Sequence, residues 1–120
     1  AVKEQSSGLY AQTLAERGFV TLAFDPSYTG ESGGYPRNVA SPDINTEDFS
    51  AAVDFLGLQK EVDRNRIGLL GICGWGGMAL NDAAMDTRVK AVASSVMYDM
   101  SRAMAKTAIP LPIVVPYCSI

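Results

Sequence analysis

The chain alternates between blocks with a helical apolar stripe and short, nearly continuous apolar runs. The first block predicts a helix over Val2–Arg17, because Gly18 follows as a natural helix end. Its apolar stripe consists of Leu9, Tyr10 and Leu14.

Three short runs rich in apolar and β-branched residues predict strands. They cover Phe19–Phe24, Ile67–Ile72 and Val89–Met97. The first two runs are almost entirely apolar, which is typical of strands buried on both faces of a sheet.

Two further helices are expected between these strands. Asn45 or Thr46 is predicted to cap the first one, whose core-facing residues are Phe49, Ala52, Val53 and Leu56. The second is expected over Gly76–Asp86, and the residues on its apolar face are Leu80, Ala83 and Ala84.

The order of these elements predicts an α/β fold. Strands that alternate with helices form a parallel sheet with right-handed crossovers, so we expect a parallel three-layer sandwich of about three strands with flanking helices. Two glycine-rich loops, Tyr28–Gly34 and Gly71–Gly77, each follow a strand. They are therefore expected at the carboxyl end of the sheet, where parallel sheets bind ligands.

Size, charge and composition narrow the possible functions. The chain has 120 residues, 48% of them apolar and 19% charged, with a net charge of −3, which describes one globular domain and gives no sign of nucleic-acid or membrane partners. The chain has two cysteines, Cys73 and Cys118, and no histidine. These are too few for a disulfide framework or a typical metal site, and we expect no cofactor. No signal peptide is seen, and the compartment cannot be inferred.

Cys73 is the strongest candidate in the chain for a chemically reactive residue. It lies at the bend of Gly71-Ile72-Cys73-Gly74, where a strand turns sharply into a helix. Small flanking residues allow a tight turn that exposes the side chain at the bend, and a helix N-terminus beside it favours a thiolate. A cysteine at a strand end can equally be a small buried apolar residue without chemistry.

Three motifs in this order resemble the α/β-hydrolase superfamily, and within it the dienelactone-hydrolase-like group. The first is the Gly71–Gly74 turn, similar to a nucleophile elbow in which cysteine replaces the usual serine. The second is the loop Asp25–Gly34, with Gly30, Ser32 and Gly34 at alternate positions. The third is the link Asp86–Val92. The resemblance covers residues 1–105, the central part of such a domain, whereas 106–120 is an apolar tail of uncertain structure.

The resemblance implies hydrolysis of an ester, lactone or similar small acyl substrate. Cys73 would be the nucleophile, the N–H of Gly74 would bind the oxyanion, and Trp75, Tyr28 and Tyr98 would contact the substrate. The catalytic histidine and acid would come from segments outside this chain, so we expect it to be inactive alone. Aligning the glycines after the bend instead shifts the nucleophile position to Gly74 or Trp75.

Two other functions are open. Gly74, Gly76 and Ala79 fit the G-x-G-x-x-A pattern of a dinucleotide-binding loop, with Asp99 at a suitable distance for a ribose contact. Alternatively, the chain is a non-catalytic truncated product. Whatever the function, a sheet of about three strands would expose unpaired edges, so we also expect self-association.

Overall fold

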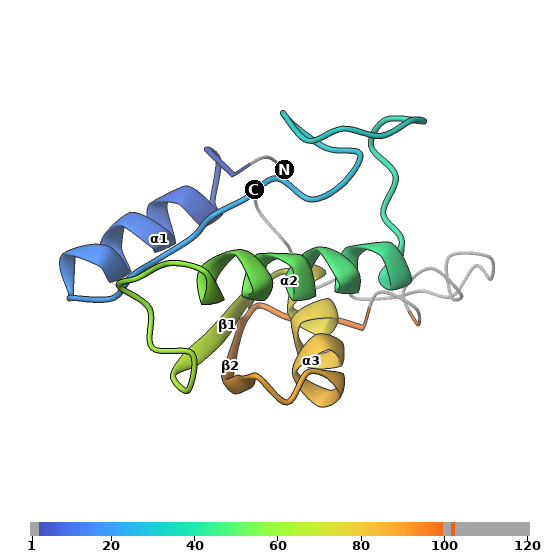
Figure 1. The fold of residues 1–120 in the computed structure, drawn as a ribbon. Helices are drawn as coiled ribbons and strands as arrows, with labels where there is room; N and C mark the ends of the chain where they lie inside the picture. Colours follow the sequence, from blue (N-terminus) through green and yellow to red (C-terminus); the bar gives the residue numbers. More distant parts are fainter. Residues whose placement is uncertain (1–2, 100–101, 103–120) are drawn as a thin grey trace.

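The chain is seen in a computed structural model that describes residues 3–99 and 102 (Figure 1). Its five elements, in chain order, are α1 (Ser7–Glu16), α2 (Pro42–Gly57), β1 (Ile67–Ile72), α3 (Trp75–Met85) and β2 (Val89–Ser95). No helix among the described residues is long and apolar enough to cross a membrane. The tail expected at 106–120, together with Cys118, lies outside the described residues.

The two strands form a parallel sheet with helices on both faces, as the sequence predicts. Gly71 pairs with Ser94, and Ile72 pairs with Ser95. Side chains alternate between the two faces of a strand, so Gly71 faces α3 whereas Ile72 and Ser95 face the other way. The Tyr10 hydroxyl of α1 lies 3.5 Å from the Ser95 hydroxyl, which places α1 on the face opposite α3.

The core lies between β1 and the pair of helices α2 and α3. Its fully or nearly buried apolar residues are Phe49, Val53, Ile67, Met78 and Ala79. Phe24 packs its edge against the Phe49 ring at a centroid distance of 5.8 Å, which is a favourable aromatic geometry. The stripe predicted around Phe49 and Val53 is therefore confirmed as the buried face of α2.

The strand predicted at Phe19–Phe24 is wrong, and this leaves two strands in the described sheet instead of about three. The segment forms no ladder hydrogen bonds, and Phe19 and Val20 are 63% and 56% exposed. A strand needs a paired neighbour as well as apolar side chains. The Phe19–Phe24 segment instead borders an apolar groove that separates it from β1.

Helix α2 begins earlier than Asn45 or Thr46. Its N-cap is Ser41 and its first residue is Pro42, whose fixed φ and missing N–H suit the first helical position. The Asn45 side chain accepts a hydrogen bond from the Ser41 N–H at 2.9 Å. A side chain of the helix thus bonds back to the backbone of the N-cap residue.

The buried face of α3 also differs from the prediction. Leu80 is 39% exposed, and the residues turned inward are Gly76, Met78, Ala79 and Asp82. Asp82 is almost completely buried and accepts a hydrogen bond from the Ser50 hydroxyl at 2.6 Å. Its other carboxylate oxygen, Oδ2, has no hydrogen-bond partner. Burial therefore raises the pKa of Asp82 above its usual 3.8.

Replacing this carboxyl by an amide is expected to stabilise the fold at neutral pH. Because the folded-state pKa of Asp82 is raised, this group contributes stability that is present below pH 3.8 and is lost as pH rises through the raised pKa. We expect Asp82→Asn to raise the free energy of unfolding at pH 7.5 by about 1–3 kcal/mol, because the amide carries no charge and an incompletely bonded buried group costs more when it is charged. Urea unfolding at pH 4.5, 6 and 7.5 measures the difference.

The advantage of Asp82→Asn over the wild type should shrink toward pH 4. Asp43→Asn is the matched control, since Asp43 is exposed in the first turn of α2. A stability gain that is equal at all three pH values would contradict the assignment of the effect to the Asp82 charge.

Candidate functional site

The turn after β1 holds Cys73 in a strained conformation. Its φ is +59°, a left-handed region that non-glycine residues rarely adopt, whereas Gly74 has φ −58°. The Cys73 N–H donates to the Ser95 carbonyl at 2.9 Å, and the Cys73 carbonyl accepts from the Gly76 N–H at 3.0 Å. The positive φ thus falls on the one residue of the bend that carries a thiol, and backbone bonds on both sides fix it there.

Close packing explains why glycines flank this turn. A Cβ on Gly71 would lie 2.6 Å from the Gly76 Cα, 2.6 Å from the Trp75 carbonyl oxygen and 2.8 Å from the Ala79 Cβ. A Cβ on Gly76 would lie 2.9 Å from the Met97 side chain. The absence of side chains at these two positions lets α3 start directly against the end of β1.

The backbone of the turn presents a hydrogen-bond donor beside Cys73. Gly74 precedes the first residue of α3, and its N–H donates to no backbone oxygen of residues 3–99. The N–H groups at the start of a helix lack intrahelical acceptors and carry partial positive charge. The Gly74 N–H therefore lies at the positive end of α3, beside Cys73.

The structure places Trp75 and Tyr98 near the turn. Trp75 is the first residue of α3 and packs against the Phe49 ring at a centroid distance of 6.5 Å, so it supports the core as well as bordering the groove. The Tyr98 carbonyl oxygen would lie 3.3 Å from a Cβ on Gly77. Tyr98 itself is 41% exposed at the carboxyl end of β2.

Tyr28 organises its own loop. It has φ +70°, its N–H donates to the Gly33 carbonyl at 2.7 Å, and its carbonyl accepts from the Asn38 N–H at 2.7 Å. The backbone of Gly34 lies directly on the Tyr28 ring, because a Cβ there would come within 2.5 Å of it. These described contacts lie within the loop, so Tyr28 shapes the loop rather than the turn at Cys73.

The Arg37 side chain donates hydrogen bonds to carbonyl groups of the same loop. Its guanidinium donates to the Ser32 carbonyl at 2.5 Å and to the Gly30 carbonyl at 2.6 Å. The Ser32 hydroxyl in turn donates to the Asp25 carbonyl at 2.5 Å. The loop is therefore held together by bonds among its own residues.

Asp25 anchors the start of this loop. It is buried, and its carboxylate accepts from the Lys3 N–H at 2.7 Å, from the Lys3 ammonium at 3.1 Å and from the Glu31 N–H at 3.0 Å. Burial opposes ionisation of Asp25, but these donors outweigh it and lower its pKa below the usual value. No sequence pattern pointed to Lys3 as a partner of Asp25, which lies 22 residues further along the chain.

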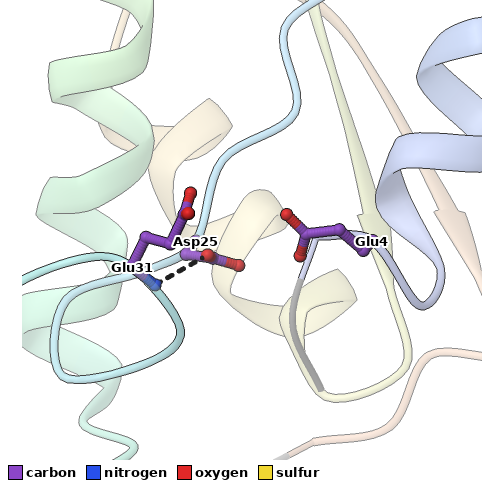
Figure 2. Close-up of side chains that lie close together, drawn as sticks. All are labelled: Glu4, Asp25 and Glu31. Carbon is purple, nitrogen blue, oxygen red and sulfur yellow. Dashed lines mark hydrogen bonds between the residues drawn. The ribbon is translucent and has the colours of Figure 1, made fainter.

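Three carboxylates gather around this anchor, as Figure 2 shows for Glu4, Asp25 and Glu31. One oxygen of each carboxylate lies within 4.8 Å of the chosen oxygens of the other two, a spacing that a metal ion could bridge. The Lys3 ammonium, however, lies 2.8 Å from Glu4 and 2.7 Å from Glu31 and also contacts Asp25. Lysine therefore already supplies the positive charge of this cluster.

Comparison with known proteins gives the family. The sequence model of the Dienelactone hydrolase family matches residues 2–117. The chain belongs to this family. The predicted fold class and the resemblance to α/β-hydrolases are thereby confirmed.

Relatives of the chain are considerably longer than the chain itself. It is 81% identical over 106 residues to the uncharacterized protein PA2218 of Pseudomonas aeruginosa, covering 88% of the chain and 29% of that protein. The crystal structure of PA2218 superposes on 88% of the chain with a TM-score of 0.86. The chain thus spans less than a third of the sequence of this relative.

Two fungal relatives carry more descriptive names. The Aspergillus aculeatus protein is the thiohydrolase aneE, 38% identical over 94 residues, which cover 78% of the chain and 30% of the relative. The crystal structure of the alpha/beta hydrolase GrgF from Penicillium is 31% identical, with a TM-score of 0.74 over 78% of the chain and 32% of GrgF. The chain is therefore similar to hydrolases along most of its length.

Packing accounts for the glycine pattern that suggested a dinucleotide site. Gly76 lies against Met97, and Ala79 is completely buried against Gly71. Close contacts within the fold thus explain these small residues without a nucleotide, and membership of a hydrolase family favours the elbow over the dinucleotide loop.

Proposed function

We propose that this chain carries the nucleophile of an acyl hydrolase and that Cys73 is that nucleophile. The observation that supports it best is the positive φ of Cys73, since the turn strains the residue that bears the thiol rather than Gly74 or Trp75. Strain of this kind concentrates at functional sites, where the surrounding structure maintains it.

The chemistry follows from the positions of the thiol and the Gly74 N–H. The Cys73 Sγ attacks the acyl carbon and forms a C–S bond, and the N–H of Gly74 stabilises the negative oxygen of the tetrahedral intermediate. The C–O or C–S bond to the leaving group then breaks, and the leaving group takes the proton that the thiol gave up. Water hydrolyses the acyl-enzyme and restores the thiol.

A base must carry this proton, and the sequence contains no histidine. We therefore propose that the base and its orienting acid are residues outside these 120 and that the chain alone has no turnover. Ester and thioester substrates both fit the mechanism. Similarity to the thiohydrolase aneE favours an acyl thioester.

A chimera tests this proposal. The matched 106 residues replace their counterpart in the P. aeruginosa protein, and hydrolysis of p-nitrophenyl acetate and of an N-acetylcysteamine thioester is measured. We expect turnover by the chimera, faster with the thioester, and none by the isolated chain. Turnover by the isolated chain that depends on Cys73 would contradict the need for outside residues. A chimera inactive on both substrates, when the parent protein is active, would contradict the proposed role of this chain.

A further inference from the structure

A polar cavity of about 380 Å³ lies between α2 and the C-terminal end of α3, where the two helices pack against each other (Figure 1). We call it the interhelix cavity. Two of its lining residues, Thr46 and Asp82, are buried and lie at its inner end. The others are half-buried or exposed: Glu47, Ser50, Met85, Asp86, Thr87 and Arg88. The interhelix cavity is therefore open to solvent at its rim and leads to a buried carboxyl group.

The inner end of the interhelix cavity offers acceptors and no donors. The Ser50 hydroxyl donates its proton to Oδ1 of Asp82 at 2.6 Å, and the Thr46 hydroxyl donates its proton to the Pro42 carbonyl at 2.6 Å. A hydroxyl has one proton and two lone pairs, so both oxygens can still accept but not donate. Oδ2 of Asp82 has no hydrogen-bond partner among the described residues. A ligand at this point must therefore bring positive charge or donors of its own.

The positive charge of the cavity rim is already engaged elsewhere. The Arg88 guanidinium donates to Oδ1 of Asp86 at 2.9 Å and to Oδ2 of Asp86 at 2.6 Å, and it also pairs with Asp54. Two carboxylates thus share this one guanidinium, and it leaves the charges of Glu47 and Asp82 unpaired. Burial and the charge of Asp86 raise the pKa of Asp82, which the Ser50 bond and Arg88 only partly oppose. A buried charge without a full partner is costly, so a cation beside Asp82 would be favourable.

We propose that the interhelix cavity binds one small monovalent cation, Na⁺ or K⁺, held by Oδ2 of Asp82 and by the hydroxyl oxygens of Thr46 and Ser50. These ligands come from both helices, so the ion would join α2 to α3. One carboxylate and two neutral oxygens carry a single negative charge, which a monovalent ion balances.

A divalent ion fits these ligands less well. Ca²⁺ takes more oxygen ligands, usually from several carboxylates, and Mg²⁺ demands a near-octahedral set. Asp86 is the other carboxylate beside Asp82, and Arg88 already holds both of its oxygens. Within the described part of the chain, three carboxylates come close enough to share an ion at Glu4, Asp25 and Glu31, away from this cavity.

Two simpler states of the site compete with a bound cation. A water molecule could donate to Oδ2 of Asp82, but it is neutral and would leave the buried charge unbalanced. A proton on Asp82 would remove the charge and require no ligand. In both states the stability of the chain would be independent of which monovalent cation the buffer contains, and this separates them from the proposal.

The test is urea unfolding of the full 120-residue chain at pH 7.5 in sodium chloride, potassium chloride or choline chloride of equal ionic strength. Screening of surface charges is then the same in all three salts. Choline carries the same charge, but its methyl groups keep the nitrogen away from oxygen ligands. We expect the folding equilibrium constant in the sodium or potassium salt to exceed that in choline chloride on the order of tenfold, when the salt concentration is about ten times its dissociation constant.

Two substitutions of aspartate by asparagine provide a matched pair. Asp82→Asn removes the charge at the inner end and should abolish the difference between the salts. Asp43→Asn changes an exposed carboxylate of α2 that does not line the cavity, and it should keep the difference. Sodium NMR gives a second measurement that does not depend on unfolding, because the wild-type chain should broaden the sodium signal more than Asp82→Asn does.

Three results would overturn the proposal. The first is equal stability of the wild-type chain in all three salts, which indicates that a water or a proton completes Asp82. The second is an equal preference for sodium or potassium in Asp82→Asn, which indicates an ion bound elsewhere. The third is stabilisation by calcium or magnesium chloride but by neither monovalent salt. None of these results depends on hydrolysis, so the proposed function is tested separately by the chimera.

Discussion

Replacing Cys73 by glycine is expected to abolish hydrolysis and to stabilise the fold in the same variant. In the chimera, loss of the thiol removes the proposed nucleophile, so kcat should fall by about 10⁴-fold or more. The backbone at Cys73 has φ +59°, which glycine adopts without steric cost. The free energy of unfolding should therefore rise by up to about 1 kcal/mol.

The opposite signs of these two effects make the experiment informative. A residue needed only for packing would lose activity and stability together. Steady-state kinetics with the thioester gives the activity, and urea unfolding of the same chimera gives the stability. Cys73→Ala is the control, because it removes the thiol but keeps a Cβ at positive φ, so activity should be lost without a gain in stability. A Cys73→Gly chimera with near-normal kcat would exclude Cys73 as the nucleophile.

A methyl group added at Gly71 is expected to cause a large loss of stability. Three atoms lie within 2.8 Å of the position that a Cβ would take, and two of them are backbone atoms that cannot rotate away. We expect Gly71→Ala to lower the free energy of unfolding by about 3 kcal/mol, because overpacking at a rigid site forces backbone shifts. Urea unfolding followed by circular dichroism measures this loss.

Gly33→Ala is the matched control for Gly71→Ala. It makes the same chemical change, but a Cβ on Gly33 meets no atom within 4 Å and Gly33 does not have positive φ. Its effect on unfolding should be within about 0.5 kcal/mol. Equal effects of the two substitutions would show that the start of α3 can move away from β1, and the close approach at Gly71 would then not be a constraint.

Local patterns in the sequence predicted the strand and the helix on either side of Cys73. Ile67–Ile72 forms β1 as expected, and α3 begins at Trp75, one residue before the predicted Gly76. A glycine-flanked bend after a buried strand leaves few other conformations for this segment. The glycines alone did not show which residue of the bend has a positive φ, because their spacing does not report the φ of each residue.

The errors in the prediction arise where structure depends on distant partners. Phe19–Phe24 has the composition of a strand, but no described strand pairs with it. Asp82 was missed as a buried residue because a helical pattern read from Leu80, Ala83 and Ala84 gave the wrong inward face. Lys3 was missed because its ion pairs reach across 22 and 28 residues. None of these contacts leaves a local signal in the sequence.

The hydrogen bonds of Arg37 within its loop have a consequence for ligand binding. Its carbonyl groups are bonded to one side chain of the same loop, and Asp25 fixes its start, so the loop is already ordered before any substrate arrives. No conformational entropy has to be lost to order it when a ligand binds. The loop should therefore keep the same conformation with and without a ligand.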